Sequence, residues 1–146
     1  MQEYYLLCSY ILEPGSIVCP GNWGRIVGLN KDNGYANYRR EEIFDKVRKE
    51  SFSDKPSRLE CIFLCDSEYQ ARKFQGKAKR SFDLLYRVKI VDQQLSVFRT
   101  DYDKAVYGGG LSDEKVEEIA RDYWSGQNIA HPEILTMSRV EIIKQV

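Results

Sequence analysis

The order in which short apolar segments follow one another constrains the fold of this chain more than any other feature of its sequence. Strand-type and helix-type patterns run in the order strands, helix, strand, helix, strands, helix, strand. A doubly wound parallel sheet requires regular alternation of strands and helices, so this order argues against that architecture. The sequence therefore predicts an α+β fold, with a mixed or antiparallel sheet core and three short helices.

The predicted strands are apolar runs, the clearest of which has the two-residue period of an extended chain. In residues 84–91, Leu84, Tyr86, Val88 and Ile90 fall on one face of that strand. The other predicted strands are residues 4–12, 17–18, 59–64, 95–99 as the hairpin partner of 84–91, and 137–143 near the end of the chain.

The predicted helices show the spacing of amphipathic helices or carry recognisable capping residues. Ser67 and Ser112 are suited to open two of them, and Gly126 is suited to end the last. Residues 20–38 are rich in glycine and asparagine and show little periodicity, which predicts a long loop. The predicted helices are residues 40–50, 67–74 and 112–125.

The length of the chain, 146 residues, is near the commonest size for one domain and sufficient for one core. We therefore expect a single domain over residues 1–146. The spacing of apolar residues within the predicted strand and helix places Val88, Ile90, Val116 and Ile119 in that core.

The charge balance gives no overall field that would attract nucleic acid or membranes, because Lys+Arg and Asp+Glu both total 22. A local cluster remains, formed by Arg72, Lys73 and residues 77–80. It could bind a few phosphates if its members share a face, although charge runs more often face water. No apolar stretch approaches the roughly 18 residues of a membrane span, so we expect no membrane partner.

The four cysteines follow neither a CxxC pair nor a zinc-finger spacing, which favours buried thiols and no metal site. A reducing, cytoplasmic location fits them best. The only histidine, His131, precedes the last predicted strand and is more readily explained as a loop residue than as a base. Signatures of phosphate loops, dinucleotide folds, serine hydrolases and zinc proteases are absent. The cysteines are Cys8, Cys19, Cys61 and Cys65.

Several segments together resemble small ADP-ribosyltransferase-like domains. Residues 56–58 (Pro-Ser-Arg), followed by the apolar residues 61–64 and a helix, are similar to the middle of such domains, and residues 86–88 to their next strand. Residues 12–17 resemble the end of the first strand of rifampicin ADP-ribosyltransferases, and residues 132–135 resemble the glutamate segment of DNA-modifying toxins. The resemblance implies transfer of ADP-ribose from NAD to a macromolecular acceptor, protein or nucleic acid.

The resemblance assigns the catalytic carboxylate to Glu133. A carboxylate there would stabilise the oxocarbenium-like ribose and hold its 2′-hydroxyl. The alternatives are a surface glutamate at the start of a strand and, for the catalytic role, Glu141. Arg58 would bind the pyrophosphate, or else brace a turn.

The remaining cofactor-binding residues are also implied by the resemblance. Many family members carry histidine or arginine on the first strand, where this chain has neither, and Ser9 or the backbone would substitute. Tyr69 and Tyr86 would stack on nicotinamide, with core packing as the alternative. From its place in the glycine-rich loop, and not from the resemblance, Trp23 is a candidate for substrate contact. Trp124 could line the cleft beside Glu133 or equally cover the edge of the sheet. A second functional hypothesis is a binding module that has lost the chemistry and holds a nucleotide, a nucleic acid or a protein.

Overall fold

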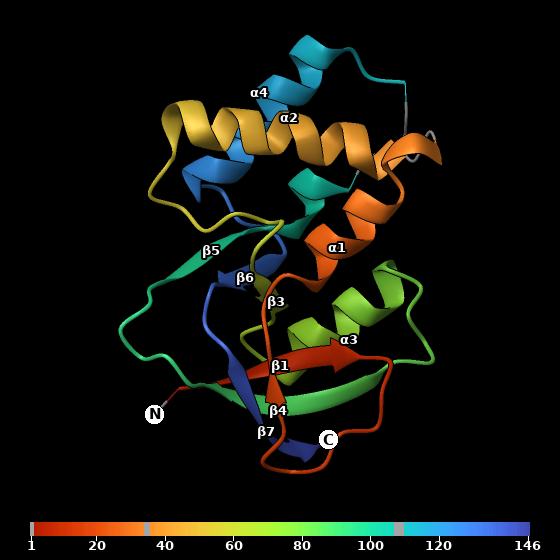
Figure 1. Cartoon of the computed structure of the whole chain (residues 1–146), viewed down its shortest axis with the longest axis vertical. Coiled ribbons are helices and arrows are strands. Elements are labelled where there is room, and N and C mark those ends of the chain that lie inside the picture. Colours follow the sequence, from red (N-terminus) through yellow and green to blue (C-terminus); the bar gives the residue numbers. More distant parts are fainter. Residues whose placement is uncertain (1, 34–35, 107–109) are drawn as a thin grey trace.

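The computed structural model describes residues 2–33, 36–106 and 110–146. Within these residues the chain forms helices and two antiparallel sheets, which confirms the α+β class (Figure 1). The strands are β1 (Glu3–Cys8), β2 (Ile17–Val18), β3 (Ile62–Leu64), β4 (Leu84–Ile90), β5 (Val97–Asp101), β6 (Pro132–Thr136) and β7 (Val140–Gln145). The helices are α1 (Asn22–Leu29), α2 (Ala36–Ser51), α3 (Glu68–Lys77) and α4 (Asp113–Ser125), with 3₁₀ turns η1 (Lys31–Asn33) and η2 (Tyr102–Ala105).

The two sheets are joined at two places. One has the strand order β1-β4-β7-β2 and the other the order β3-β6-β5, and every pairing is antiparallel. Tyr5 and Cys65 exchange two backbone hydrogen bonds of 2.9 Å between β1 and the end of β3. Residues 137–139 carry the chain from β6 directly into β7, and so from one sheet to the other.

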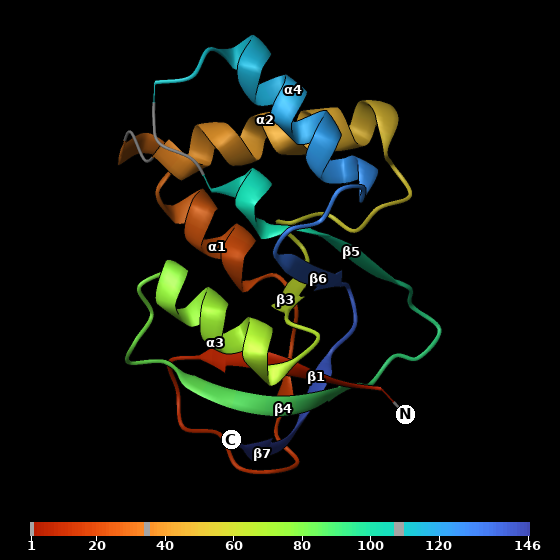
Figure 2. The same ribbon diagram turned by 180° about the vertical axis from the view of Figure 1, so that it is seen from behind.

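The helices cover the sheets from different sides. Figure 2 shows α3 against β1 and β4, where the fully buried Ala71 packs with Leu7 and Leu85. The other three helices lie toward the three-stranded sheet, with α2 crossing α4. None of the helices within the described residues is long and apolar enough to cross a membrane.

Local patterns located several elements well. Ser67 accepts a hydrogen bond from the backbone N–H of Gln70 and Ser112 from that of Lys115, so both serines cap helices as predicted. Gly126 ends α4 with a φ of 67°, in the left-handed region that glycine adopts without strain. The core predictions hold for Val88, Ile90 and Val116, which are buried, whereas Ile119 is only partly buried.

Several sequence predictions differ from the structure, and for the first of them a distant strand pairing is the reason. Residues 95–99 contribute to β5, which pairs with β6 rather than forming a hairpin with β4. The segment 137–143 is a connection followed by β7, residues 59–61 do not belong to β3, and β1 ends at Cys8 and not at residue 12. Residues 20–38 contain α1, so the described residues form four α-helices where three were predicted. Gly24 in α1 has to be glycine, because a Cβ there would lie 2.0 Å from the carbonyl oxygen of Leu59. Glycine permits this close approach despite its low helix propensity.

Candidate functional site

A buried cluster of polar side chains, which we call the Arg58 network, lies between α2, α4 and β6. Arg58 Nε donates to both carboxylate oxygens of Glu41 at 3.0 Å. Its Nη1 donates to the hydroxyl of Tyr123 at 2.6 Å and to Glu133 Oε2 at 3.0 Å. The Tyr123 hydroxyl in turn donates to the same oxygen of Glu133 at 2.7 Å. One arginine therefore pairs with two carboxylates, and all four residues are buried.

Different elements supply the four residues of the network. Glu41 comes from α2, Tyr123 from α4, Glu133 from β6, and Arg58 from the turn before β3. That turn is fixed by Ser57, whose hydroxyl accepts a hydrogen bond from the backbone N–H two residues later. The network can form only when the two helices and the three-stranded sheet are packed together.

The ionisation of the network follows from this pairing. Burial alone would raise the pKa of Glu41, but Arg58, Arg40 and the indole of Trp23 together hold it below its ordinary value. Burial also tends to lower the pKa of Arg58, whereas Glu41, Tyr123 and Glu133 raise it well above the usual range. The pKa of Tyr123 is raised, chiefly by burial. Arg58 is therefore charged and Tyr123 neutral at physiological pH.

The structure joins three of the predicted site residues and adds two more. Trp23 Nε1 donates to Glu41 Oε1 at 3.0 Å, so Trp23, Arg58 and Glu133 belong to one connected cluster. Sequence reasoning assigned neither Glu41 nor Tyr123 to the site. A charge among the apolar positions of α2 was the available signal for Glu41. For Tyr123 it was the hydroxyl of a buried tyrosine, which usually needs a hydrogen-bond partner.

The other predicted site residues lie elsewhere. Tyr86 is fully buried, and its hydroxyl bonds to two backbone groups of the segment after β1. Trp124 is also fully buried, and its indole donates to the carbonyl of Phe44 at 2.9 Å. Core packing, the alternative considered for Tyr86, thus describes both. Ser9 and Tyr69 are exposed, and among the described residues neither bonds to the Arg58 network.

Arg58 binds carboxylates of the protein itself. Its charge faces Glu41 on one side and Glu133 on the other, and its guanidinium lies 4.8 Å from the ring centre of Phe63. In this arrangement the side chain orients Glu133 and is not directed toward solvent. The pyrophosphate contact implied by the resemblance would require a different arrangement of Arg58.

A small hollow of about 10 Å³ lies beside the start of β6. Tyr102, one of its lining residues, has a pKa that is raised first by burial and next by the negative charge of Glu133. The hollow has room for about one water molecule, so a nucleotide could enter only after side chains moved. Its lining consists of Gln70, Lys73, Phe74, Lys77, Tyr102, His131 and Pro132.

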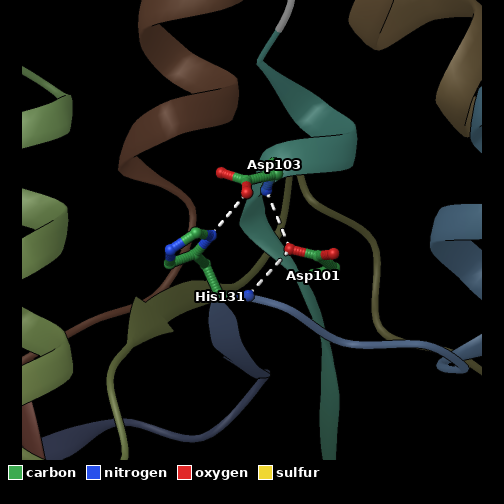
Figure 3. A group of neighbouring side chains, drawn as sticks. All are labelled: Asp101, Asp103 and His131. Carbon is green, nitrogen blue, oxygen red and sulfur yellow. Dashed lines mark hydrogen bonds and ion pairs between the residues drawn. The ribbon is translucent and has the colours of Figure 1, made fainter.

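Three side chains of the types that can bind metal ions lie close together at the edge of this hollow. Asp101, Asp103 and His131 bring ligand atoms within 4.8 Å of one another (Figure 3). The Asp101 carboxylate accepts the backbone N–H groups of Asp103, Ala130 and His131, and so fixes the turn before β6. Lys77 Nζ lies 2.9 Å from Asp103 Oδ1 and already supplies a cation. We therefore assign these residues to an ion-pair cluster and not to a metal centre.

The buried cysteines are not suited to nucleophilic catalysis. All four thiols are free, and Cys61 and Cys65 are buried as expected, whereas Cys8 is half-buried and Cys19 is exposed. Burial raises the pKa of Cys65 to about 12 and that of Cys61 above its ordinary range. Since the thiolate is the reactive form, these two thiols are inert near neutral pH.

A larger groove of about 620 Å³ runs between α1 and α2. Val27 and Leu59 line its apolar part, and Glu41 connects it to the Arg58 network. The other lining residues are Tyr38, Glu42, Asp45, Lys46, Lys49 and Glu50. The network thus lies between this groove and the small hollow beside β6.

Comparison with known families gives one result. The family model described as Protein of unknown function (DUF2441) matches residues 25–146. The chain belongs to the DUF2441 family. The match includes all four residues of the Arg58 network, whereas Trp23 and β1 of this DUF2441 chain lie before it. No curated protein matches the chain in sequence.

Proposed function

We propose that this protein transfers ADP-ribose from NAD to a macromolecular acceptor, with Glu133 as the catalytic carboxylate. The resemblance in sequence suggests the reaction, and the state of Glu133 supports it. Oε2 accepts hydrogen bonds from Arg58 and Tyr123, whereas Oε1 accepts none from the residues that the structure describes. The Glu133 side chain as a whole is 7% exposed.

A carboxylate held in this way suits the proposed chemistry. The bond between the ribose C1′ and nicotinamide breaks, and its electron pair leaves with nicotinamide. The ribose then carries positive charge, which Glu133 stabilises while Oε1 accepts a hydrogen bond from the 2′-hydroxyl. A nucleophile of the acceptor forms the new bond to C1′ and loses a proton. Arg58 and Tyr123 position Glu133 beforehand, which avoids reorganisation during the reaction.

A second candidate is a binding module with the same fold and no chemistry, which would hold a nucleotide, a nucleic acid or a protein. The small size of the hollow beside the start of β6 favours it, since that hollow has room for about one water molecule and NAD does not fit without rearrangement. Under this alternative Glu133 is retained to pair the buried charge of Arg58.

The deciding experiment compares three single variants for transfer of labelled ADP-ribose and for NAD hydrolysis. Glu133→Gln keeps the size of the side chain and removes its charge, and we expect turnover to fall by roughly 10²–10³-fold. Glu41→Gln removes the same charge from the other side of Arg58, and Glu141→Gln removes an exposed pair with Lys89 at 3.3 Å. Each variant is assayed below its own unfolding midpoint.

The outcomes separate the candidates. Loss of turnover in Glu133→Gln, with Glu41→Gln less affected and Glu141→Gln unchanged, supports Glu133 as the catalytic group. Equal losses in Glu133→Gln and Glu41→Gln would show that activity depends on the charge of the whole network. If the unmodified protein neither transfers ADP-ribose nor hydrolyses NAD, the enzyme proposal fails. NAD binding without turnover in calorimetry then favours the binding module.

A further inference from the structure

The outward face of α3 and the loop that follows it carry cations and aromatic rings that the proposed function does not use. Positions 69, 72, 73, 76 and 77 recur at helical spacing and are all exposed, while Ala71 on the opposite side is buried. The loop to β4 extends this surface, which we call the α3 surface. It comprises Tyr69, Arg72, Lys73, Lys77, Lys79, Arg80 and Phe82.

Large apolar side chains are unusually exposed on this surface. Phe82 is 97% exposed and Tyr69 is 67% exposed. Gln75 of α3 donates hydrogen bonds to the backbone carbonyls of Arg80 and Asp83, which holds the loop that carries Phe82 against the helix. Exposed apolar groups that gather in this way commonly mark a binding site.

The cations of the α3 surface are only partly neutralised by the protein. Lys77 pairs with Asp103 at 2.9 Å and Arg80 pairs with Asp83. Arg72 lies 3.9 Å from Glu68, at the limit of an ion pair. Lys73 and Lys79 form no ion pair with a carboxylate in the part of the chain that the structure describes. Lys73 Nζ lies instead 5.4 Å from the ring centre of Tyr69.

Helix stability accounts for part of this pattern. Cations near the C-terminus of a helix interact favourably with its dipole, which explains Lys77, Lys79 and Arg80. It does not explain Arg72 and Lys73, which lie further from that end, or the exposure of Phe82. A ligand that presents both negative charge and flat apolar surface would satisfy all of these features together.

We propose that the α3 surface binds single-stranded nucleic acid, with its cations on the phosphates and its aromatic rings stacked on bases. Sites for single strands combine these two elements. A membrane surface fits less well, because a membrane-bound helix inserts a continuous apolar face, and the apolar side of α3 is buried against the four-stranded sheet. This binding does not require NAD or the proposed transfer activity.

The position of the surface also suggests a use. Lys73 and Lys77 line the hollow beside the start of β6 together with Pro132, the residue that directly precedes Glu133 in the chain. If the proposed transfer activity is correct, the bound nucleic acid is then the acceptor, a step that rests on that proposal.

The test measures binding of labelled single-stranded DNA and RNA of about 20 nucleotides by fluorescence anisotropy, without NAD and at several salt concentrations. The surface variant is Arg72→Ala/Lys73→Ala/Lys79→Ala. Its matched control, Lys49→Ala/Lys115→Ala/Arg121→Ala, removes the same charge from exposed positions of α2 and α4. We expect the surface variant to bind at least about 10-fold more weakly and to lower the salt slope by about 2, with the control unchanged.

A separate variant tests the stacking. Phe82→Ala should weaken binding by about 5- to 150-fold and leave the salt slope unchanged. The proposal is overturned if no saturable binding occurs, if both triple variants weaken binding equally, or if Phe82→Ala has no effect. A further measurement tests binding of the protein to vesicles that contain phosphatidylserine. Binding to vesicles but not to oligonucleotides also overturns it and assigns the surface to membranes.

Discussion

Replacement of Arg58 by methionine tests the Arg58 network directly. Methionine fills much of the same volume but supplies no charge and no hydrogen-bond donor. Glu41 and Glu133, which lie on either side of the guanidinium at 3.0 Å, then lose their shared partner inside the protein. Both carboxylates are almost fully buried, with exposed fractions of 1% and 6%, so water cannot replace the arginine.

The expected cost is large relative to the stability of a domain. Removal of one partner of a buried ion pair typically costs about 3–5 kcal/mol, and two carboxylates are affected here. We expect Arg58→Met to lower the free energy of unfolding by at least about 3 kcal/mol, out of a total of roughly 5–15 kcal/mol. Urea unfolding followed by circular dichroism measures this difference.

The pH dependence of the stability lost in Arg58→Met shows whether the buried carboxylates cause the loss. In the native protein the pKa of Glu41 is below its ordinary value. The pairing of Glu41 therefore contributes stability at pH values above that ordinary pKa, and this contribution is lost as the pH falls. In Arg58→Met burial dominates and raises the pKa of Glu41. The loss of unfolding free energy in Arg58→Met is then greatest at neutral pH and decreases as acid protonates the carboxyl group.

A triple variant provides the control for lost packing. Adding Glu41→Gln and Glu133→Gln to Arg58→Met removes the charges of both carboxylates that lost Arg58 and should restore a substantial part of the stability. The reasoning is refuted if Arg58→Met costs less than about 1 kcal/mol at neutral pH, or if the triple variant is as unstable as the single one at every pH.

Two further predictions concern backbone space and acid stability. Gly24→Ala should lower the free energy of unfolding by about 1–3 kcal/mol, because the new methyl group meets the Leu59 carbonyl. Gly28→Ala, in the same helix with open space around it, should raise the free energy of unfolding by about 0.5–1 kcal/mol, and equal effects in chemical denaturation would contradict this account. Arg139 lowers the pKa of Asp92 to about 2, so the stability that this pair contributes is complete above the ordinary pKa of aspartate and is lost as the pH falls toward about 2. The difference in stability between the native protein and Asp92→Asn should decrease over that range, and a difference that does not change with pH would show another cause.

The sequence by itself determined features that depend on neighbouring residues. The alternation in residues 84–91 located β4, and serines with suitable residues after them located the starts of α3 and α4. The mixed order of these patterns was sufficient for the α+β class. Such features are readable because their energy comes from contacts within about one helical turn or one strand.

Only the tertiary structure decided the site and the pairing of the strands. Arg58 meets Glu41, Tyr123 and Glu133 from 17, 65 and 75 residues away, and no local pattern encodes such distances. The sequence proposed Arg58 and Glu133 as separate contacts for a cofactor, whereas the structure pairs them with each other. β5 likewise pairs with β6, because antiparallel partners are chosen by the burial of whole faces and not by nearness in sequence. Helix, strand and cap are thus local properties of this chain, while a buried charge can exist only where distant elements supply its partner.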